Sequence, residues 1–493
     1  MIDIIAVKNR MLEIAVHGNL VSHHSADKSM EVILASIREK RDEQIKNGQT
    51  KKPKEKPMST DEIFDIPDSW AWVALGDLCL LISRGKSPQY SDVPKYPVFA
   101  QKCNQPHQLA LEKALFLDED TLPKWPEYFR LQDGDIVINS TGNGTMGRVG
   151  YFETAALSKK YPFMVPDSHI SLLRVGEGII PKYIYYALRS PSIQKLMFKQ
   201  FRGSTNQREY YIDSVYATPV PIPCTSEQEA IADKLDQIYR VLDIIDAAQQ
   251  QYSADAESLK AKLITLGIQG KLTEQLPEDG TAEELYQHIQ AEKQRLIKEG
   301  KIKKEKPLPE IKPEEVPFEI PRNWKWVRLR SVLLKYCTRP FGSMLHKSDY
   351  AESGVPLINP ADIANGKVSF DKIKRVAPSK VPEMTSYILS KGDVVIGRRG
   401  EMGRAAVITK NEDGYICGTG CFFATPSGYF EPEYFVTMLK SDFIRQSLQS
   451  QSVGSTMDNL NHTILGNLLI PFPPLAEQRR ILETIDRLSL ILK

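Results

Sequence analysis

The chain has 493 residues, which is too long for one hydrophobic core, and its 41% hydrophobic content is ordinary for globular packing. No run of about 18 apolar residues indicates a membrane span, and the N-terminus lacks the basic segment and cleavage site of an export signal, so we expect a cytoplasmic protein. With 64 basic and 62 acidic residues the net charge is +2, so overall charge neither requires nor excludes nucleic acid.

The first predicted element is an N-terminal helix. Its apolar positions follow helical spacing: Ile4, Val7, Met11 and Ile14. A second helix is expected over residues 29–48, and the Lys- and Pro-rich segment 51–57 indicates an extended connector. We interpret this connector as solvated, although its lysines also suit contact with phosphate. Residues 1–66 form this N-terminal helical region.

Residues 67–225 are predicted to form the first globular domain. Short β-like runs occur at 135–138 and 170–173, and a helical patch follows at 181–189. The mixture indicates an α+β domain without fixing the order of its strands.

Residues 226–320 hold a long helix, a short helix and a second connector. The apolar steps alternate four and three, with Gln249 in the one missing slot: Ile231, Leu235, Ile238, Leu242, Ile245, Tyr252, Ala256, Leu259, Leu263 and Leu266. This heptad pattern is typical of a helix packed along another helix, and the segment is long enough to span roughly 60 Å. A capping box at 281–284 starts the short helix, and Lys-rich residues 303–307 follow it.

The second globular domain is predicted over residues 321–475, with strands at 394–396 and 421–424 and a helix at 432–441. Residues 476–493 then form a C-terminal helix. Its apolar positions are Ile481, Ile485, Leu488 and Leu492.

Motifs of the first domain return in the same order in the second. Ile66–Val73 returns as Ile320–Val327, Leu131–Ile138 as Leu389–Ile396, Gly203–Thr205 as Gly454–Thr456, and Pro221–Pro223 as Pro471–Pro473. A period this long indicates a duplicated domain, which suggests contact with a pseudo-symmetric target at two places. We interpret the repeated tryptophans as core anchors rather than stacking platforms: Trp70, Trp72, Trp324 and Trp326.

The same repeat aligns the long helix with both ends of the chain. Its second half aligns with residues 4–14, its first half aligns with residues 481–492, and all eight aligned seam positions are apolar. The partner helix is therefore predicted to be split between the termini, with nine residues, or about 14 Å, missing between them. We expect an antiparallel pair whose broken member brings the two chain ends near each other. The alternative is two unrelated amphipathic helices in separate cores.

The doubled motifs carry a resemblance to a known family. Trp-x-Trp-Val, Gly-Asp-[Ile/Val]-Val, Gly-Ser-Thr and Pro-[Ile/Phe]-Pro-x3-Glu-Gln each occur twice. With the split helix, this order resembles the specificity (S) subunit of Type I restriction–modification enzymes over nearly the whole chain. The resemblance implies an α+β fold with two pseudo-two-fold-related mixed α/β recognition domains, separated by an antiparallel pair of long coiled-coil helices in a circularly organised repeat. One departure is the early stop of the C-terminal helix, which would weaken one docking surface.

The resemblance also implies a function and partners. Each recognition domain reads half of a bipartite target in double-stranded DNA, and the helices dock two methyltransferase subunits, to which restriction (motor or nuclease) subunits bind. No cofactor is expected in this chain, whereas S-adenosylmethionine is expected on the methyltransferase subunits. Two rival hypotheses are a coiled-coil scaffold that assembles partners without reading DNA and a self-contained DNA-modifying enzyme.

Reading DNA requires Arg, Lys, Asn or Gln at base edges and hydroxyls or main-chain amides at phosphates. Both domains offer such residues just after a strand and in the Gly-Ser-Thr turn, although each alone could be an ordinary polar turn. The candidates in the first domain are Asn139, Ser140, Thr141, Asn143, Arg148, Arg202, Ser204, Thr205, Asn206, Gln207 and Arg208. Those in the second are Arg398, Arg399, Arg404, Ser455, Thr456 and Asn459.

No catalytic residue or metal site is predicted. The sequence has no G-x-x-x-x-G-K-[ST] loop, and segment 359–362 lacks the second proline and the aromatic residue of an adenine-holding Asn-Pro-Pro-aromatic motif. The six cysteines contain no C-x-x-C pair, and the adjacent His23 and His24 lack the matching acidic residues that a metal site would need. A reduced protein without zinc is therefore expected. The chemistry is therefore expected in other subunits.

Overall fold

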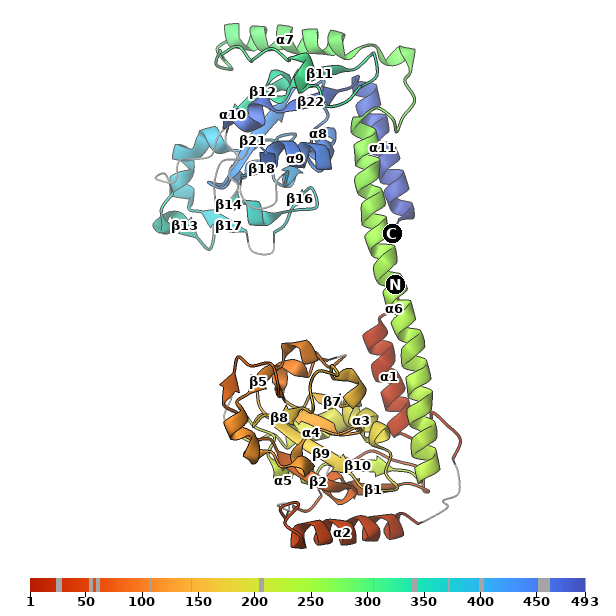
Figure 1. Cartoon of the computed structure of the whole chain (residues 1–493). Helices are drawn as coiled ribbons and strands as arrows, with labels where there is room; N and C mark the ends of the chain where they lie inside the picture. Colours follow the sequence, from red (N-terminus) through yellow and green to blue (C-terminus); the bar gives the residue numbers. More distant parts are fainter. Residues whose placement is uncertain are drawn as a thin grey trace. The chain divides into compact units, whose positions relative to one another are not determined.

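The computed structural model describes residues 1–23, 29–52, 56–58, 63–106, 108–142, 144–203, 208–304, 306–337, 345–370, 373–398, 403–450 and 462–492. The chain forms two compact units, unit 1 (Met1–Gln249) and unit 2 (Gln250–Lys493) (Figure 1). Within the described ranges, every helix is too short or too polar to cross a bilayer.

Unit 1 combines helices with short strands. Its helices are α1 (Ile4–Val16), α2 (Met30–Lys46), α3 (Pro181–Arg189), α4 (Pro191–Lys199), α5 (Ile212–Tyr216) and the first part of α6 (Thr225–Ile268). Its strands are β1 (Ala71–Ala74), β2 (Cys79–Arg84), β3 (Tyr90–Ser91), β4 (Pro97–Phe99), β5 (Leu115–Leu117), β6 (Ile136–Asn139), β7 (Val149–Tyr151), β8 (Val165–Pro166), β9 (Ile170–Val175) and β10 (Pro219–Ile222). The strands and helices predicted for this domain are confirmed.

Unit 2 repeats this plan. Its helices are the rest of α6, α7 (Ala282–Lys298), α8 (Pro432–Leu439), α9 (Asp442–Ser450), α10 (His462–Asn467) and α11 (Leu475–Ile491). Its strands are β11 (Lys325–Arg328), β12 (Leu333–Cys337), β13 (Tyr350–Ala351), β14 (Val355–Ile358), β15 (Ile363–Ala364), β16 (Lys367–Val368), β17 (Lys374–Val376), β18 (Val394–Gly397), β19 (Ala405–Val407), β20 (Ile416–Cys417), β21 (Cys421–Pro426) and β22 (Leu469–Phe472).

The sheets of the two units have the same topology. The orders β2-β9-β6-β7 and β3-β5-β4-β8 in unit 1 match β12-β21-β18-β19 and β13-β17-β14-β20 in unit 2. In each unit a two-stranded pair, β1-β10 or β11-β22, joins the start of the domain to its end, and unit 2 adds the hairpin β15-β16. Since the topology repeats strand by strand, the duplication predicted from the motifs is confirmed.

The repeated Trp and Glu-Gln motifs form one anchor in each unit. Trp70 and Trp324 are buried, and their indole N–H groups donate to Glu227 at 3.0 Å and to Glu477 at 2.7 Å. The glutamine that follows each glutamate accepts the main-chain N–H of the residue just before α3 or α8, at 2.9 Å in both units. The anchor therefore ties the start of each domain to the start of α6 or α11, and these two tryptophans are core residues, as predicted.

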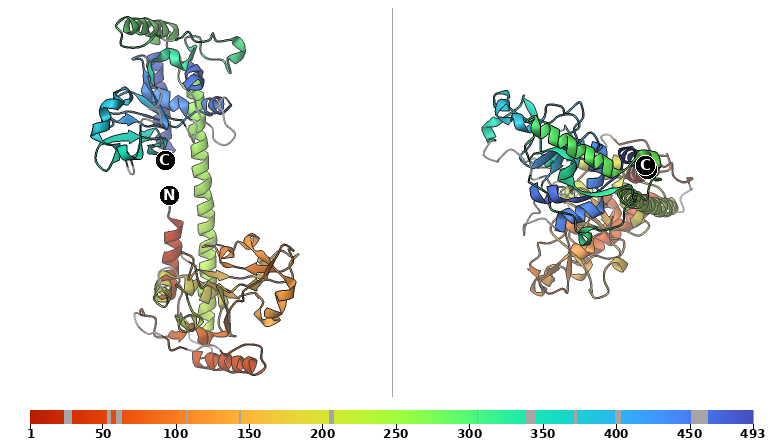
Figure 2. Two further views of the ribbon diagram at one scale, coloured as in Figure 1. Left: turned by 90° about the vertical axis from the view of Figure 1, so that its left-hand side faces the viewer. Right: turned by 90° about the horizontal axis from the view of Figure 1, so that it is seen from above.

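In unit 1, α1 lies antiparallel to the first part of α6 (Figures 1 and 2). Lys8 pairs with Asp243 at 2.5 Å, and the carboxamide of Gln249 bonds both the main-chain N–H and the carbonyl of Ile2, at 2.5 and 3.1 Å. Gln249, the polar residue in the heptad pattern, thus holds the main chain just before α1. Seam residues of unit 1 that are buried are Ile4, Ile231, Leu235 and Leu242, and those that are half-buried are Val7, Met11, Ile14, Ile238 and Ile245.

In unit 2, α11 packs against the second part of α6. A side chain at Gly267 would come within 2.9 Å of Ile481 and 3.4 Å of Ile485, so the helices are in close contact there. Seam residues of unit 2 that are buried are Ile481 and Ile485, and those that are half-buried are Leu263, Leu266, Leu488 and Leu492. The seam prediction is wrong for Tyr252 and Leu259, which are 49% and 48% exposed.

The short helices α2 and α7 start differently, and the capping box predicted at 281–284 is confirmed. At α7, Thr281 accepts the N–H of Glu284 at 3.3 Å and Glu284 accepts the N–H of Thr281 at 3.0 Å, which completes the capping box. At α2, Ser29 accepts the N–H of Val32 at 3.4 Å, and Val32 has no carboxylate to return the bond.

Candidate nucleic-acid interface

The candidate site of unit 1 lies at one edge of the sheet β2-β9-β6-β7. Neighbouring strands in this sheet are antiparallel, so the ends of β2 and β6 meet the starts of β9 and β7. The register pairs Arg84 with Ser171 and Asn139 with Ile170, which sets Arg84, Thr141 and the residue before β9, His169, at the same edge. Residues distant in the sequence therefore share one surface.

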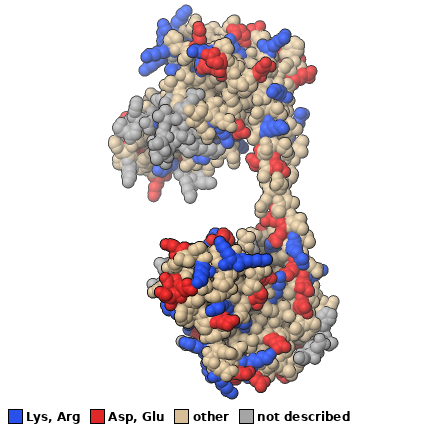
Figure 3. Space-filling model, in the orientation of Figure 1, with Lys and Arg blue, Asp and Glu red and all other residues tan. Residues whose placement is uncertain are grey.

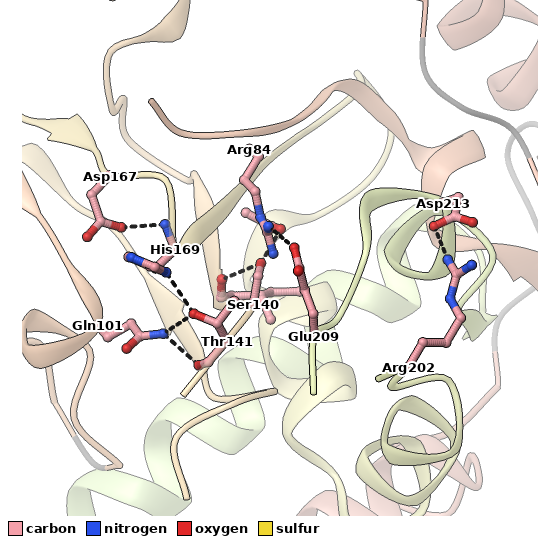
Figure 4. Close-up of polar contacts among 11 residues, drawn as sticks. Arg84, Gln101, Ser140, Thr141, Asp167, His169, Arg202, Glu209 and Asp213 are labelled. Carbon is pink, nitrogen blue, oxygen red and sulfur yellow. Dashed lines mark hydrogen bonds and ion pairs between the residues drawn. The ribbon is translucent and has the colours of Figure 1, made fainter. Parts of the chain in front are cut away.

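Three side chains at this edge form a polar cluster, Gln101, Thr141 and His169 (Figure 4). The Gln101 amide nitrogen donates to the carbonyl of Thr141 at 2.6 Å and to its hydroxyl at 2.7 Å. The same hydroxyl lies 2.8 Å from Nδ1 of His169. His169 is exposed and the other two are half-buried, so the cluster is held in place from within and keeps hydrogen-bonding capacity toward solvent.

A buried layer fixes this cluster. Asn139 and Ser140 are fully buried, so the prediction that they contact DNA is corrected: their partners are Asn104 at 3.0 Å and Ser171 at 2.5 Å. The main-chain N–H of Ser140 donates to the carbonyl of His169 at 2.8 Å, and that of His169 donates to Asp167 at 2.8 Å. Burial raises the pKa of Asp167, and this N–H offsets part of the rise.

Two arginine–carboxylate pairs lie beside the cluster (Figure 4). Arg84 donates to Glu209, and Arg202 donates to Asp213. Burial alone would raise the pKa of Asp213, but the Arg202 guanidinium holds that pKa below its ordinary value. Arg202 and Glu209 also exchange main-chain hydrogen bonds at 3.0 and 2.8 Å. This antiparallel β-bridge between Arg202 and Glu209 joins the two arginine–carboxylate pairs.

The remaining predicted residues of unit 1 have diverse surroundings. Arg148 donates to the carbonyl of Asn104 at 2.7 Å, and the Arg208 guanidinium lies 4.8 Å from the ring centre of Phe198. On the face of unit 1 in Figure 3, basic and acidic side chains are interspersed. Candidates outside the described residues are Asn143, Ser204, Thr205, Asn206, Gln207, Arg399, Ser455, Thr456 and Asn459.

In unit 2 the equivalent edge carries different side chains. The N–H of Arg398 donates to the carbonyl of Gly420 at 2.9 Å, as that of Ser140 does to His169, so Arg398 follows β18 where Ser140 follows β6. Side chains at Gly418 and Gly420 would come within 2.5 Å of Asn359 and 2.7 Å of Pro360, so this turn has no room for an imidazole. The Arg398 guanidinium lies 4.9 Å from the ring centre of Phe422, and Arg404 donates to the carbonyl of Pro360 at 3.0 Å.

Sequence reasoning found Thr141 and Arg202 but missed Gln101, His169, Arg84 and Glu209. His169 and Arg84 do flank β-like runs, which is the signal that selected Thr141. Gln101 lies in a segment with little counterpart in the second domain, so the repeat gave no reason to select it.

Comparison with known proteins places the chain. The family model described as the type I restriction modification DNA specificity domain matches residues 67–251 and 321–493. The chain belongs to this family. The EcoAI specificity subunit of Escherichia coli is 26% identical, with 99% of this chain and 90% of that protein covered. The EcoEI specificity subunit of the same organism is 25% identical, with 98% and 89% covered.

A solved chain from work on the assembly and conformational transition of the type I R-M system has the same fold. It is 18% identical, with a TM-score of 0.50 over 87% of this chain and 92% of that one. The resemblance predicted from the doubled motifs, including the fold it implies, is confirmed.

Proposed function

We propose that the chain is the DNA-recognition subunit of a type I restriction–modification complex and that it reads a bipartite target in double-stranded DNA. One observation carries this proposal: the same strand topology presents the polar cluster in unit 1 and Arg398 in unit 2. A shared framework with different side chains suits two half-sites of different sequence. Each edge enters the major groove, where base pairs present distinct patterns of donors and acceptors.

The helices set the spacer and dock the partners in this proposal. A rod of roughly 60 Å suits half-sites about one turn apart, since faces of DNA recur every 34–36 Å or so. Two methyltransferase subunits bind the helices, and restriction subunits bind the resulting complex. Exposed apolar residues support such docking: Ile5, Val241 and Ile244 in unit 1, and Tyr252, Leu490 and Ile491 in unit 2.

The chemistry belongs to the partners. The chain is a non-catalytic subunit, and S-adenosylmethionine binds the methyltransferase subunits in the cytoplasm. The predicted domains 1–66, 67–225, 226–320, 321–475 and 476–493 assign the recognition role to the second and fourth.

Methylation mapping in a host with and without this chain tests the proposal. We expect a methylated bipartite motif only when the chain is present, and no motif would contradict it. A gel shift with the methyltransferase partner on genomic fragments separates DNA reading from a scaffold role.

Heptad variants test the spacing. Deleting or adding seven residues between Leu242 and Leu259 should change the preferred spacer and leave both half-sites unaltered. Altered half-sites with the same spacer would refute the role of the helices.

A further inference from the structure

Unit 1 contains a cavity of about 560 Å³ beside the candidate interface. It is formed by the connector after α2, the end of β2, and the segments near Phe129 and Tyr211. Its wall includes six basic residues and a single acidic one, Asp213. The basic residues are Lys51, Lys52, Arg84, Lys86, Lys124 and Arg202, and we name this the basic cavity.

Most of this positive charge is not neutralised by the protein. Arg84 and Arg202 pair with Glu209 and Asp213. Among the described residues, no carboxylate lies within ion-pair distance of the four lysines, and Lys86 instead lies 5.4 Å from the ring centre of Phe129. Four cations around one concavity raise the local concentration of anions.

Arg84 adds unsatisfied donors to this region. Its Nε and Nη2 atoms are buried and find no hydrogen-bond partner within the described ranges. A buried guanidinium N–H without an acceptor is costly, so an acceptor brought by a ligand or a water would stabilise it. The lysines therefore supply the charge that an anion in the cavity would meet, and the buried Arg84 donors belong to the same wall.

The basic cavity adjoins the polar cluster. Arg84 ends β2 and belongs to the cavity wall, and Figure 4 shows it between the polar cluster and the Arg202–Asp213 pair. An anion in the cavity is therefore next to the side chains proposed to read bases. In protein–DNA complexes, phosphate contacts position the duplex and base contacts specify its sequence.

Unit 2 uses the corresponding connector differently. Lys303 and Lys304 line a cavity with α7 and Trp326, and the lining contains none of the strand ends that carry Arg398 and Arg404. In the part of the chain that the structure describes, connector lysines thus share a cavity with the sheet edge that carries the candidate DNA-reading residues in unit 1 and not in unit 2.

We propose that the basic cavity binds the phosphodiester backbone next to the half-site that unit 1 reads. Lys51, Lys52 and Lys124 neutralise phosphates there without reading sequence, while the polar cluster contacts the bases. The connector, interpreted from its sequence as solvated, thereby becomes part of the DNA-binding surface. This inference rests on the proposed function, since it assigns a further contact to the same ligand.

The test compares Lys51→Gln/Lys52→Gln with wild type, using the full chain in complex with its methyltransferase subunits. The ligand is a duplex that carries the mapped motif, and its dissociation constant is measured by fluorescence anisotropy at several NaCl concentrations. Because each neutralised phosphate contributes about 0.9 to the slope of log K against log salt, the double variant should have a slope shallower by roughly 1.8. Lys124→Gln should add about 0.9 more. Methylation mapping should show unchanged half-sites.

Lys159→Gln/Lys160→Gln is the matched control, because these lysines are exposed and outside the cavity wall. It should leave the slope unchanged. An unchanged slope in the cavity variant, or a changed half-site sequence, would overturn the inference. A lost methyltransferase subunit with an unchanged slope would also overturn it and would indicate an acidic protein segment as the occupant. If wild type lacks sequence-specific binding, the proposed function fails, and this outcome is separate because the slope for non-specific binding is still measurable.

Discussion

The two units keep the same anchor and differ at the same sheet edge. Trp70 with Glu227 and Trp324 with Glu477 make equivalent buried bonds, whereas the sheet edge carries Thr141 and His169 in unit 1 but Arg398 and a glycine turn in unit 2. The anchor is buried, so changes there cost stability. The edge consists of strand ends outside the core, so its residues can change while the fold stays the same. Folding and DNA recognition therefore depend on separate residues.

Removing an anchor should have the largest effect. We expect Trp70→Ala and Trp324→Ala each to lower the free energy of unfolding by about 3–5 kcal/mol, because each leaves a cavity and removes a hydrogen bond from a buried glutamate. Denaturant unfolding followed by circular dichroism measures this. Trp72→Ala, at a half-buried position, is the control and should cost less. Equal losses of unfolding free energy for Trp70→Ala and Trp72→Ala would contradict a special role of the buried anchor.

Changing one edge should alter one half-site. Thr141→Val removes the hydroxyl that joins Gln101 to His169, so we expect relaxed sequence preference in the half-site of unit 1, by about 1–3 kcal/mol or roughly fivefold to 150-fold. Arg398→Gln should affect only the other half-site. Methylation mapping of both variants measures the sequence preference in each half-site. A change in both half-sites from either variant would contradict independent recognition of the half-sites by the two units.

The caps of α2 and α7 allow a smaller comparison. Thr281→Ala removes half of a reciprocal capping box and should cost about 1 kcal/mol, whereas Ser29→Ala removes a single bond of 3.4 Å and should cost less. Thermal unfolding of the two variants ranks them. A larger loss for Ser29→Ala would show that α2 depends on its cap more than its geometry indicates.

The smallest effect should be on the pH dependence of unit 2. Burial raises the pKa of Glu477, and bonds from Trp324, Gln275 and Thr273 offset part of the rise. Because the folded state then holds this proton more tightly than the unfolded state, stability from this group should increase as pH falls from 7 toward about 4.3, the ordinary glutamate value. Unfolding midpoints in that window should rise more in wild type than in Glu477→Gln. The exposed Glu483→Gln should behave like wild type.

Local patterns predicted the elements well. The apolar steps and glycines around α6, the capping box of α7 and the doubled Glu-Gln motif each act within a few residues, so sequence spacing is enough to find them. The polar cluster was only partly predictable, because the register of β6 and β9 and the turn after β4 bring its members together. Asn139 and Ser140 were misassigned for the same reason: a polar run after a strand suggests a surface turn, and only the fold supplies Asn104 and Ser171 as partners. The predicted meeting of the chain ends stays a prediction.

The main-chain carbonyls of Asn104 and Pro360 affect how an arginine scan should be read. Each accepts a guanidinium N–H, from Arg148 and from Arg404, so the two arginines support the segments that follow β4 and β14, respectively. Truncating either one would loosen that segment and weaken DNA binding even if the side chain never touched a nucleotide. Lysine replacements at these two positions keep the charge but not the planar donor geometry. They would distinguish loss of support for the segment from loss of a direct contact with DNA.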